Sequence, residues 1–196
     1  MNIRRPADRD DSEHSETRLL RRIVERDQEA LEELYVLYYP KLSRFLLRLL
    51  GASGQQALPG LINETLFVVW NRADSYNHTS KVSSWVFGIA LRIAKKQQST
   101  QFSYETRQQE LAQDLEFAGE PWESGLERAD LLSKAIQRLS CEQKAVIELT
   151  YFNGLHYSEI AEIMGCPENT VKTRMYHARL RLRTLLRELE EAVRSE

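Results

Sequence analysis

The sequence is poor in the residues that build disulfide frameworks and metal centres. Its 196 residues include only two cysteines, Cys141 and Cys166, which stand far apart, and four scattered histidines. A disulfide framework shows as an even set of spaced cysteines, and a metal site needs more ligands at closer spacing. We therefore predict no disulfide framework, no metal ion and no other cofactor. Cys141 falls in the first turn of an expected helix, a position that lowers the pKa of a thiol.

The chain also has no apolar run near the roughly 20 residues that a membrane-spanning helix needs. Its first 13 residues are polar and lack the apolar core of a secretory signal, so we expect a cytoplasmic protein. There is no pairing of a nucleophile with a base and no glycine-rich phosphate loop. We therefore expect neither an enzyme nor a small-molecule substrate. The net charge is only −2, so acids elsewhere must balance any basic surface.

Strand-like alternation is absent as well, and apolar residues recur at helical spacing along most of the chain. The predicted fold is all-α, with two small helical domains joined by a flexible acidic linker. Residues 1–16 are polar and charge-rich and are expected to form a disordered tail. Residues 17–96 form the first domain, in which Asp27 caps a helix that buries Tyr35, and Pro40 opens a new helix.

Residues 97–122 are the predicted linker. Between Ser103 and Glu127 the sequence has seven acids and one base. At most a partial helix is expected, around residues 105–116. Such a segment can mimic nucleic acid, or it can be an acidic spacer that favours solubility, and the sequence alone leaves both open.

Residues 123–190 form the second domain, for which four helices are predicted. Ser140 and Gln143 have the spacing of a capping box. Further along, a short apolar helix, a turn at Gly165 and a basic helix follow one another. This order is that of a helix-turn-helix, whose second helix enters the DNA major groove.

The basic helix begins near Pro167 and has two faces. Val171, Met175, Ala178 and Leu185 mark a buried stripe, and between residues 168 and 187 six Lys or Arg stand against one acid. A basic amphipathic helix is often only a solvated face. The preceding helix and turn, and the polar residues of its early turns, favour DNA binding instead.

Residues 139–183 closely resemble the promoter-reading C-terminal domain of bacterial extracytoplasmic-function (ECF) sigma factors, which belong to the sigma-70 family. The first domain fits the same family at ALEELY (residues 30–35), NETLF (63–67) and SSWVFGIA (83–90). Together the matches cover about residues 17–96 and 123–187. The resemblance implies a non-catalytic subunit that binds core RNA polymerase and directs promoter-specific initiation.

The resemblance implies three groups of site residues. The −35 element, read as duplex, would be contacted by Thr170, Lys172, Thr173, Arg174, Tyr176, His177 and Arg179. The melted −10 element would be captured by Tyr76, Asn77, His78, Thr79, Ser80, Lys81, Trp85, Arg92, Lys95 and Lys96. Core polymerase would be bound by Leu61, Ile62, Asn63, Glu64, Phe67, Val68 and Asn71. Core packing alone also explains Trp85, and we favour it.

Three positions depart from the family pattern. Residues 55–60 lack the acids that usually precede Leu61, Arg92 stands where many members have a base-reading Asn, and His177 replaces a frequent Arg. These departures bear on polymerase affinity and promoter preference.

The implied partners are core RNA polymerase, promoter DNA as duplex and as melted single strand, and an anti-sigma factor. The alternative function is a helix-turn-helix regulator that is not a polymerase subunit.

Overall fold

The computed structural model describes residues 6–51, 54–109 and 127–194. Within these ranges the chain forms helices and no strand, which confirms the predicted all-α fold. The N-terminal domain contains α1 (Pro6–Val24), α2 (Gln28–Leu50), α3 (Leu58–Arg72), the short 3-10 helix η2 (Ala73–Ser75) and α4 (Val82–Gln109). The C-terminal domain contains α5 (Glu127–Gln137), α6 (Cys141–Ile147), the π-helical turn η3 (Glu148–Phe152), α7 (Tyr157–Met164) and α8 (Glu168–Arg194).

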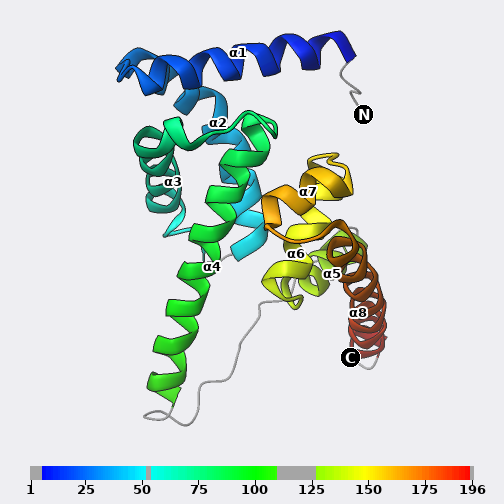
Figure 1. The fold of residues 1–196 in the computed structure, drawn as a ribbon. Coiled ribbons are helices and arrows are strands. Elements are labelled where there is room, and N and C mark those ends of the chain that lie inside the picture. Colours follow the sequence, from blue (N-terminus) through cyan, green and yellow to red (C-terminus); the bar gives the residue numbers. More distant parts are fainter. Residues whose placement is uncertain (1–5, 52–53, 110–126, 195–196) are drawn as a thin grey trace.

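The two domains lie side by side (Figure 1). In the first, α1 crosses one end of α2, and the long α4 runs beside α2 and α3. In the second, α7 faces α4 and α8 lies on the far side. The buried apolar residues of both domains form one continuous cluster. No helix in the described ranges is both long enough and apolar enough to cross a membrane.

The first helix corrects the prediction of a disordered tail over residues 1–16. Residues 6–16 belong to α1, and residues 1–5 lie outside the described residues. The end of the expected tail is part of the core, because the Glu16 carboxylate is buried. Glu16 accepts a hydrogen bond from the Tyr38 hydroxyl (2.7 Å) and pairs with Lys41 Nζ (3.2 Å). Burial and the neighbouring Glu16 charge raise the pKa of Tyr38 well above its ordinary value.

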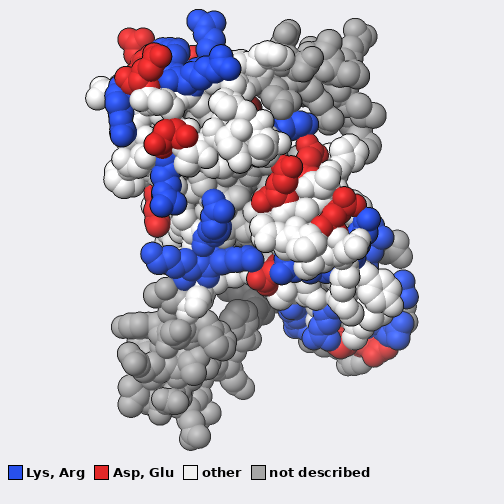
Figure 2. Space-filling view, viewed as in Figure 1, with Lys and Arg blue, Asp and Glu red and all other residues white. Residues whose placement is uncertain are grey.

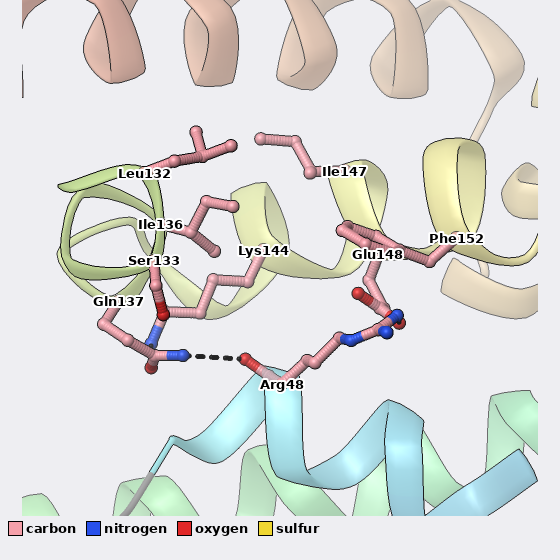
Figure 3. A pocket seen from close by; sticks show the side chains of 9 residues that line it. All are labelled: Arg48, Leu132, Ser133, Ile136, Gln137, Lys144, Ile147, Glu148 and Phe152. Carbon is pink, nitrogen blue, oxygen red and sulfur yellow. Dashed lines mark hydrogen bonds and ion pairs between the residues drawn. The ribbon is translucent and has the colours of Figure 1, made fainter. Parts of the chain in front are cut away.

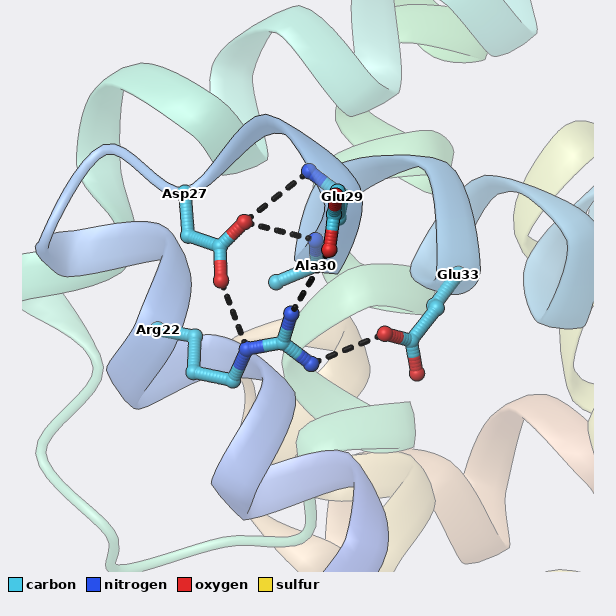
Figure 4. Close-up of polar contacts among 5 residues, drawn as sticks. All are labelled: Arg22, Asp27, Glu29, Ala30 and Glu33. Carbon is cyan, nitrogen blue, oxygen red and sulfur yellow. Dashed lines mark hydrogen bonds and ion pairs between the residues drawn. The ribbon is translucent and has the colours of Figure 1, made fainter.

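The corner between α1 and α2 is fixed by polar contacts (Figure 4). Asp27 Oδ1 accepts from the backbone N–H groups of Glu29 and Ala30, which confirms the predicted N-cap. Arg22 Nε donates to Asp27 Oδ2 at 2.7 Å, and Arg22 Nη1 donates to Glu33 at 2.8 Å. The hydrogen bond from Arg22 is the main reason that the pKa of Asp27 lies below its ordinary value, against an opposing desolvation effect.

The prediction that Pro40 opens a new helix is wrong, since α2 continues through it. A proline inside a helix deprives the carbonyl four residues earlier of its donor. Here that residue is Val36, which is 74% exposed, so water can reach its carbonyl. Arg44 Nε also donates to the Pro40 carbonyl at 3.1 Å.

The predicted linker also begins later than expected, because α4 continues from residue 97 to Gln109. This stretch has no glycine or proline and is rich in residues with good helix propensity. Residues 110–122 of the linker lie outside the described residues.

The four α-helices of the C-terminal domain have the predicted order, and two of their ends follow the expected local chemistry. Ser140 and Gln143 form the capping box at the start of α6. The turn after α7 has Gly165 in the left-handed region at φ 61°, and the Cys166 N–H donates to the Ala161 carbonyl. A left-handed glycine at this point ends a helix without strain and turns the chain into the next helix.

Candidate nucleic-acid interface

The helix α8 has the two faces that its sequence predicts. Val171, Met175, Ala178 and Leu185 are buried against the rest of the C-terminal domain. Because α7, the Gly165 turn and α8 follow one another in a compact unit, the domain contains a helix-turn-helix with α8 in the position of a recognition helix.

Five of the seven predicted −35 residues lie exposed on α8, namely Lys172, Thr173, Tyr176, His177 and Arg179. Lys172 forms an ion pair with Glu168 one turn earlier at 2.8 Å, and the Thr173 hydroxyl donates to the Asn169 carbonyl. The rings of Tyr176 and His177 lie 5.4 Å apart. These side chains present donors and aromatic edges on one accessible surface.

Arg174 and Thr170 are half-buried rather than exposed. Arg174 Nη1 lies 3.3 Å from Cys166 Sγ, so its guanidinium is held against the turn that precedes α8. Arg179 has a partner that the sequence did not suggest. Its Nη2 donates to the Tyr151 hydroxyl at 2.6 Å, and its guanidinium lies over the Tyr151 ring at 5.8 Å. Since Tyr151 is 28 residues earlier and belongs to η3, no local pattern could have found this contact.

The predicted −10 loop is a compact turn before α4. Tyr76, predicted to contact DNA, is instead buried, and its hydroxyl donates to the Ser80 carbonyl. Asn77 Oδ1 accepts from the N–H (3.2 Å) and the hydroxyl (2.7 Å) of Thr79. His78 has a left-handed backbone at φ 57°, and its ring lies 4.7 Å from that of Tyr76.

The aromatic and basic residues of α4 divide into two groups. Trp85 is half-buried, packs against the core and lies 5.7 Å from the Tyr76 ring, as the favoured packing interpretation expects. Arg92 and Lys96 are exposed. Lys81, just before α4, and Lys95 are instead paired with carboxylates of the C-terminal domain, at 2.9 Å to Glu159 and 3.0 Å to Glu142. Figure 2 shows acidic and basic side chains that meet along this junction.

The predicted polymerase-binding residues also divide by exposure. Leu61 and Ile62 are buried in the core, so they stabilise α3 and their side chains do not reach a partner in this conformation. Val68 is half-buried, whereas Asn63, Glu64, Phe67 and Asn71 are exposed. An open groove between α2 and α3 includes two of the exposed residues and is lined by Gln28, Leu31, Glu32, Tyr35, Asn63, Leu66, Phe67 and Trp70.

The α2 side of this groove is a surface that sequence reasoning missed. Tyr35 was expected to be buried, but it is exposed and stacks on the exposed Tyr39 with ring centroids 5.4 Å apart. Val36 and Phe67 are 74% and 67% exposed. A group of exposed large apolar side chains is typical of a protein–protein contact.

The pKa of the Cys141 thiol is shifted in the direction opposite to the predicted one. It lies in the first turn of α6, as predicted, but burial and the nearby Glu142 charge raise its pKa to about 11. Among the residues that the structure describes, no three His, Cys, Asp or Glu side chains gather as a metal site would require.

Comparisons with known proteins place this geometry in a family. Residues 129–182, which include the helix-turn-helix, match the family model described as Sigma-70, region 4. The ECF RNA polymerase sigma-E factor of Haemophilus influenzae is 28% identical over 174 residues, covering 82% of this chain and 89% of that protein. The chain is similar to ECF sigma factors over four fifths of its length. The ECF sigma factor SigL of Mycobacterium tuberculosis is likewise 28% identical, over 81% of this chain and 90% of its own length.

Solved structures agree with this similarity. The sigma factor RpoE of Bartonella quintana, in complex with the anti-sigma factor NepR, superimposes with a TM-score of 0.60 at 28% identity, over 80% of this chain and 96% of that one. CnrH in complex with the cytosolic domain of CnrY has a TM-score of 0.62 at 18% identity and shows the same fold. The curated relatives cover both helical domains of this chain, whereas the region 4 model matches only the second.

Proposed function

We propose that this chain is an ECF sigma factor, which binds core RNA polymerase and directs it to promoters through a −35 and a −10 element. The observation that carries the proposal is α8, a recognition helix whose outer face presents Lys172, Thr173 and Tyr176. It lies within the segment that matches sigma-70 region 4. The sigma factor supplies recognition only, and the chemistry of RNA synthesis belongs to the polymerase.

In the proposed complex α8 lies in the major groove of the −35 duplex. Its early turns face base edges, which side chains read by hydrogen bonds and apolar contacts. Lys172, Thr173 and His177 would contact bases, and Arg179 would hold a phosphate. The exposure of all four side chains on α8 supports this assignment. Arg174 would have to leave Cys166 Sγ to read a base.

The −10 contact is proposed to involve the loop of residues 76–81 and one face of α4. A single strand binds through base stacking on aromatic rings and through contacts of cations with its backbone. The half-buried Trp85 and the exposed His78 offer rings, and Arg92 offers an exposed cation. Arg92 in place of the frequent family Asn is expected to change base preference or to hold phosphate.

The groove between α2 and α3 is proposed as the contact with core polymerase. Its exposed aromatic residues Tyr35 and Phe67, flanked by Asn63, suit an apolar partner surface with a polar rim. An anti-sigma factor is proposed as a second partner, since the similar sigma factor RpoE of Bartonella quintana was crystallised in complex with the anti-sigma factor NepR. The proposed place of action is the cytoplasm, where core polymerase acts.

The two DNA contacts are proposed to be weak separately and strong together. A lone helix-turn-helix with few phosphate contacts binds DNA with a Kd on the order of 10⁻⁴ to 10⁻⁶ M non-specifically. Tying two modules to one polymerase raises the effective concentration of the second contact. The free protein should therefore bind promoter DNA weakly, and nanomolar binding by the protein alone at physiological salt would refute this mechanism.

Run-off transcription with purified core polymerase and a randomised promoter library tests the proposal. A sigma factor programs core polymerase alone and enriches two separated sequence elements. A helix-turn-helix regulator, the alternative function, gives transcripts only when another specificity subunit is added. That outcome would reject the proposed function.

A further inference from the structure

A pocket of about 180 Å³ lies where the end of α2 meets α5, α6 and η3 (Figure 3). We propose that this pocket binds a small organic monocarboxylate, whose charged group is held by Lys144 and whose apolar body packs on the surrounding side chains. Such a site is independent of promoter recognition, because none of its lining residues belongs to the three groups predicted to contact DNA or polymerase.

The wall of the pocket is mostly apolar. Leu132 and Ile136 come from α5, Ile147 from α6 and Phe152 from η3. Figure 3 shows the side chains of Leu132 and Ile147 pointing toward one another across the space. A dry cavity of about 150 Å³ lined by such side chains accepts a benzene molecule. The pocket is therefore large enough for a benzene ring with one small substituent, or for an aliphatic chain of similar size.

Lys144 is the polar group that an apolar wall does not explain. It is 8% exposed, and burial lowers the pKa of its ammonium group. A lysine ammonium has three donors, and among the described residues its one hydrogen-bond acceptor is Gln137 Oε1 at 3.2 Å.

The Gln137 amide is itself fixed, because its Nε2 donates to the Arg48 carbonyl at 3.2 Å, the dashed line in Figure 3. It therefore offers Lys144 a neutral acceptor and no charge. In the described part of the chain no carboxylate forms an ion pair with Lys144 Nζ. A buried cation without an anionic partner is costly, and an anionic ligand would supply that partner.

The charges around the pocket favour a ligand with a single negative charge. The Glu148 carboxylate also lines the pocket, but Arg48 Nη1 lies 2.9 Å from its Oε1. These two charges cancel, which leaves the one positive charge of Lys144. A carboxylate neutralises that charge, whereas a phosphate dianion would leave excess negative charge close to Glu148. An apolar pocket with a few polar groups that fix orientation is the usual form of a small-molecule site.

The pocket also has a way in. Leu132 is 40% exposed, Phe152 is 53% exposed and the Arg48 side chain is 43% exposed, whereas Ile147 and Lys144 are buried. The rim is therefore accessible to solvent and the cation lies below it. A ligand can enter without either helix being displaced.

The test measures the binding of two carboxylates to the full-length protein by isothermal titration calorimetry. Benzoate and hexanoate are an aromatic and an aliphatic probe of suitable size, and benzamide is a neutral probe with the shape of benzoate. Lys144→Met removes the charge and keeps most of the apolar stem. The matched control is Lys134→Met, which removes an exposed lysine of α5 that does not line the pocket.

We expect the wild type and Lys134→Met to bind benzoate equally, and Lys144→Met to bind it at least about tenfold more weakly. Benzamide should bind all three proteins weakly and equally, because it has no charge for Lys144 to neutralise. Unchanged benzoate binding by Lys144→Met would overturn the proposal. So would a wild type that binds neither benzoate nor hexanoate at concentrations up to about 10 mM.

A second variant tests the position of the ligand and leaves Lys144 in place. Ile136→Trp fills the space between α5 and α6 with a larger side chain, so it should weaken the binding of both carboxylates at least about tenfold. A folded Ile136→Trp protein with wild-type affinity for benzoate would show that the ligand binds elsewhere and would overturn the assignment of this pocket.

Discussion

Arg48→Met should weaken the junction between the domains by leaving a buried carboxylate without its partner. Glu148 is 4% exposed, and Arg48 Nη1 lies 2.9 Å from its Oε1. Methionine keeps much of the apolar stem of arginine but has no donor. Arg44→Met is the matched control, because Arg44 lies on the same helix and donates to the Pro40 carbonyl within that helix.

The size of the effect follows from the exposure of the two partners. Breaking a fully buried ion pair costs about 3–5 kcal/mol. Arg48 is 43% exposed, so water compensates part of the loss and we expect about 1.5 kcal/mol. The lost contact of the guanidinium with the Phe152 ring adds about 0.5 kcal/mol. For a chain of this length, a total of about 2 kcal/mol lowers the Tm by roughly 4–8 °C.

The pH dependence gives a sharper check than the Tm alone. Burial raises the pKa of Glu148 above its ordinary value, and the hydrogen bond from Arg48 opposes that shift. Between the ordinary and the raised pKa the folded protein holds more protons than the unfolded chain. Glu148 therefore lowers the free energy of unfolding as the pH rises through that window. Without Arg48 the pKa rises further. The decrease in Tm of Arg48→Met relative to the wild type, measured by circular dichroism on heating, should therefore be smaller at pH 5 than at pH 7. Equal losses in Arg48→Met and Arg44→Met, or a larger defect at pH 5, would refute this reasoning.

Three further variants test the proposed interfaces. Arg174→Ala should lower promoter use by about 1–3 kcal/mol and change preference at one position in the randomised library, whereas a uniform loss over all −35 variants would make Arg174 a phosphate anchor. Tyr151→Phe removes the acceptor that orients Arg179, so the double variant with Arg179→Ala should bind −35 DNA no more weakly than Arg179→Ala alone. Additive losses in gel-shift assays of the polymerase complex would exclude this positioning role. Phe67→Ala should lower affinity for core polymerase about tenfold in pull-down titrations, and because Phe67 is exposed the Tm should stay near the wild-type value, so a parallel loss of Tm would point to misfolding instead.

Features decided within one or two helical turns could be predicted from the sequence. The Asp27 cap and the capping box of Ser140 and Gln143 each involve groups no more than three residues apart. The buried stripe of α8 follows from helical periodicity alone. The helix-turn-helix was predictable for the same reason, because its turn needs a left-handed residue and Gly165 supplies one.

Features that depend on distant partners could not be predicted in this way. Glu16 sits in a polar stretch, and its contacts with Tyr38 and Lys41, 22 and 25 residues later, make its burial favourable. The pairing of Arg48 with Glu148 spans 100 residues. The assignment of Tyr35 to a buried stripe was wrong because helical periodicity does not say where a stripe ends at the rim of a groove.

The π-helical turn η3 affects how this protein can change in length. A π-turn contains one more residue than an α-turn, and one residue rotates a helix by about 100°. In η3 the neighbours Tyr151 and Phe152 contact arginines of different domains, Arg179 on α8 and Arg48 on α2. A deletion of one residue here would give a more regular helix but would turn both rings away from their arginines. Among descendants of this sequence, loss of a single codon should therefore be tolerated less in η3 than in the loops on either side.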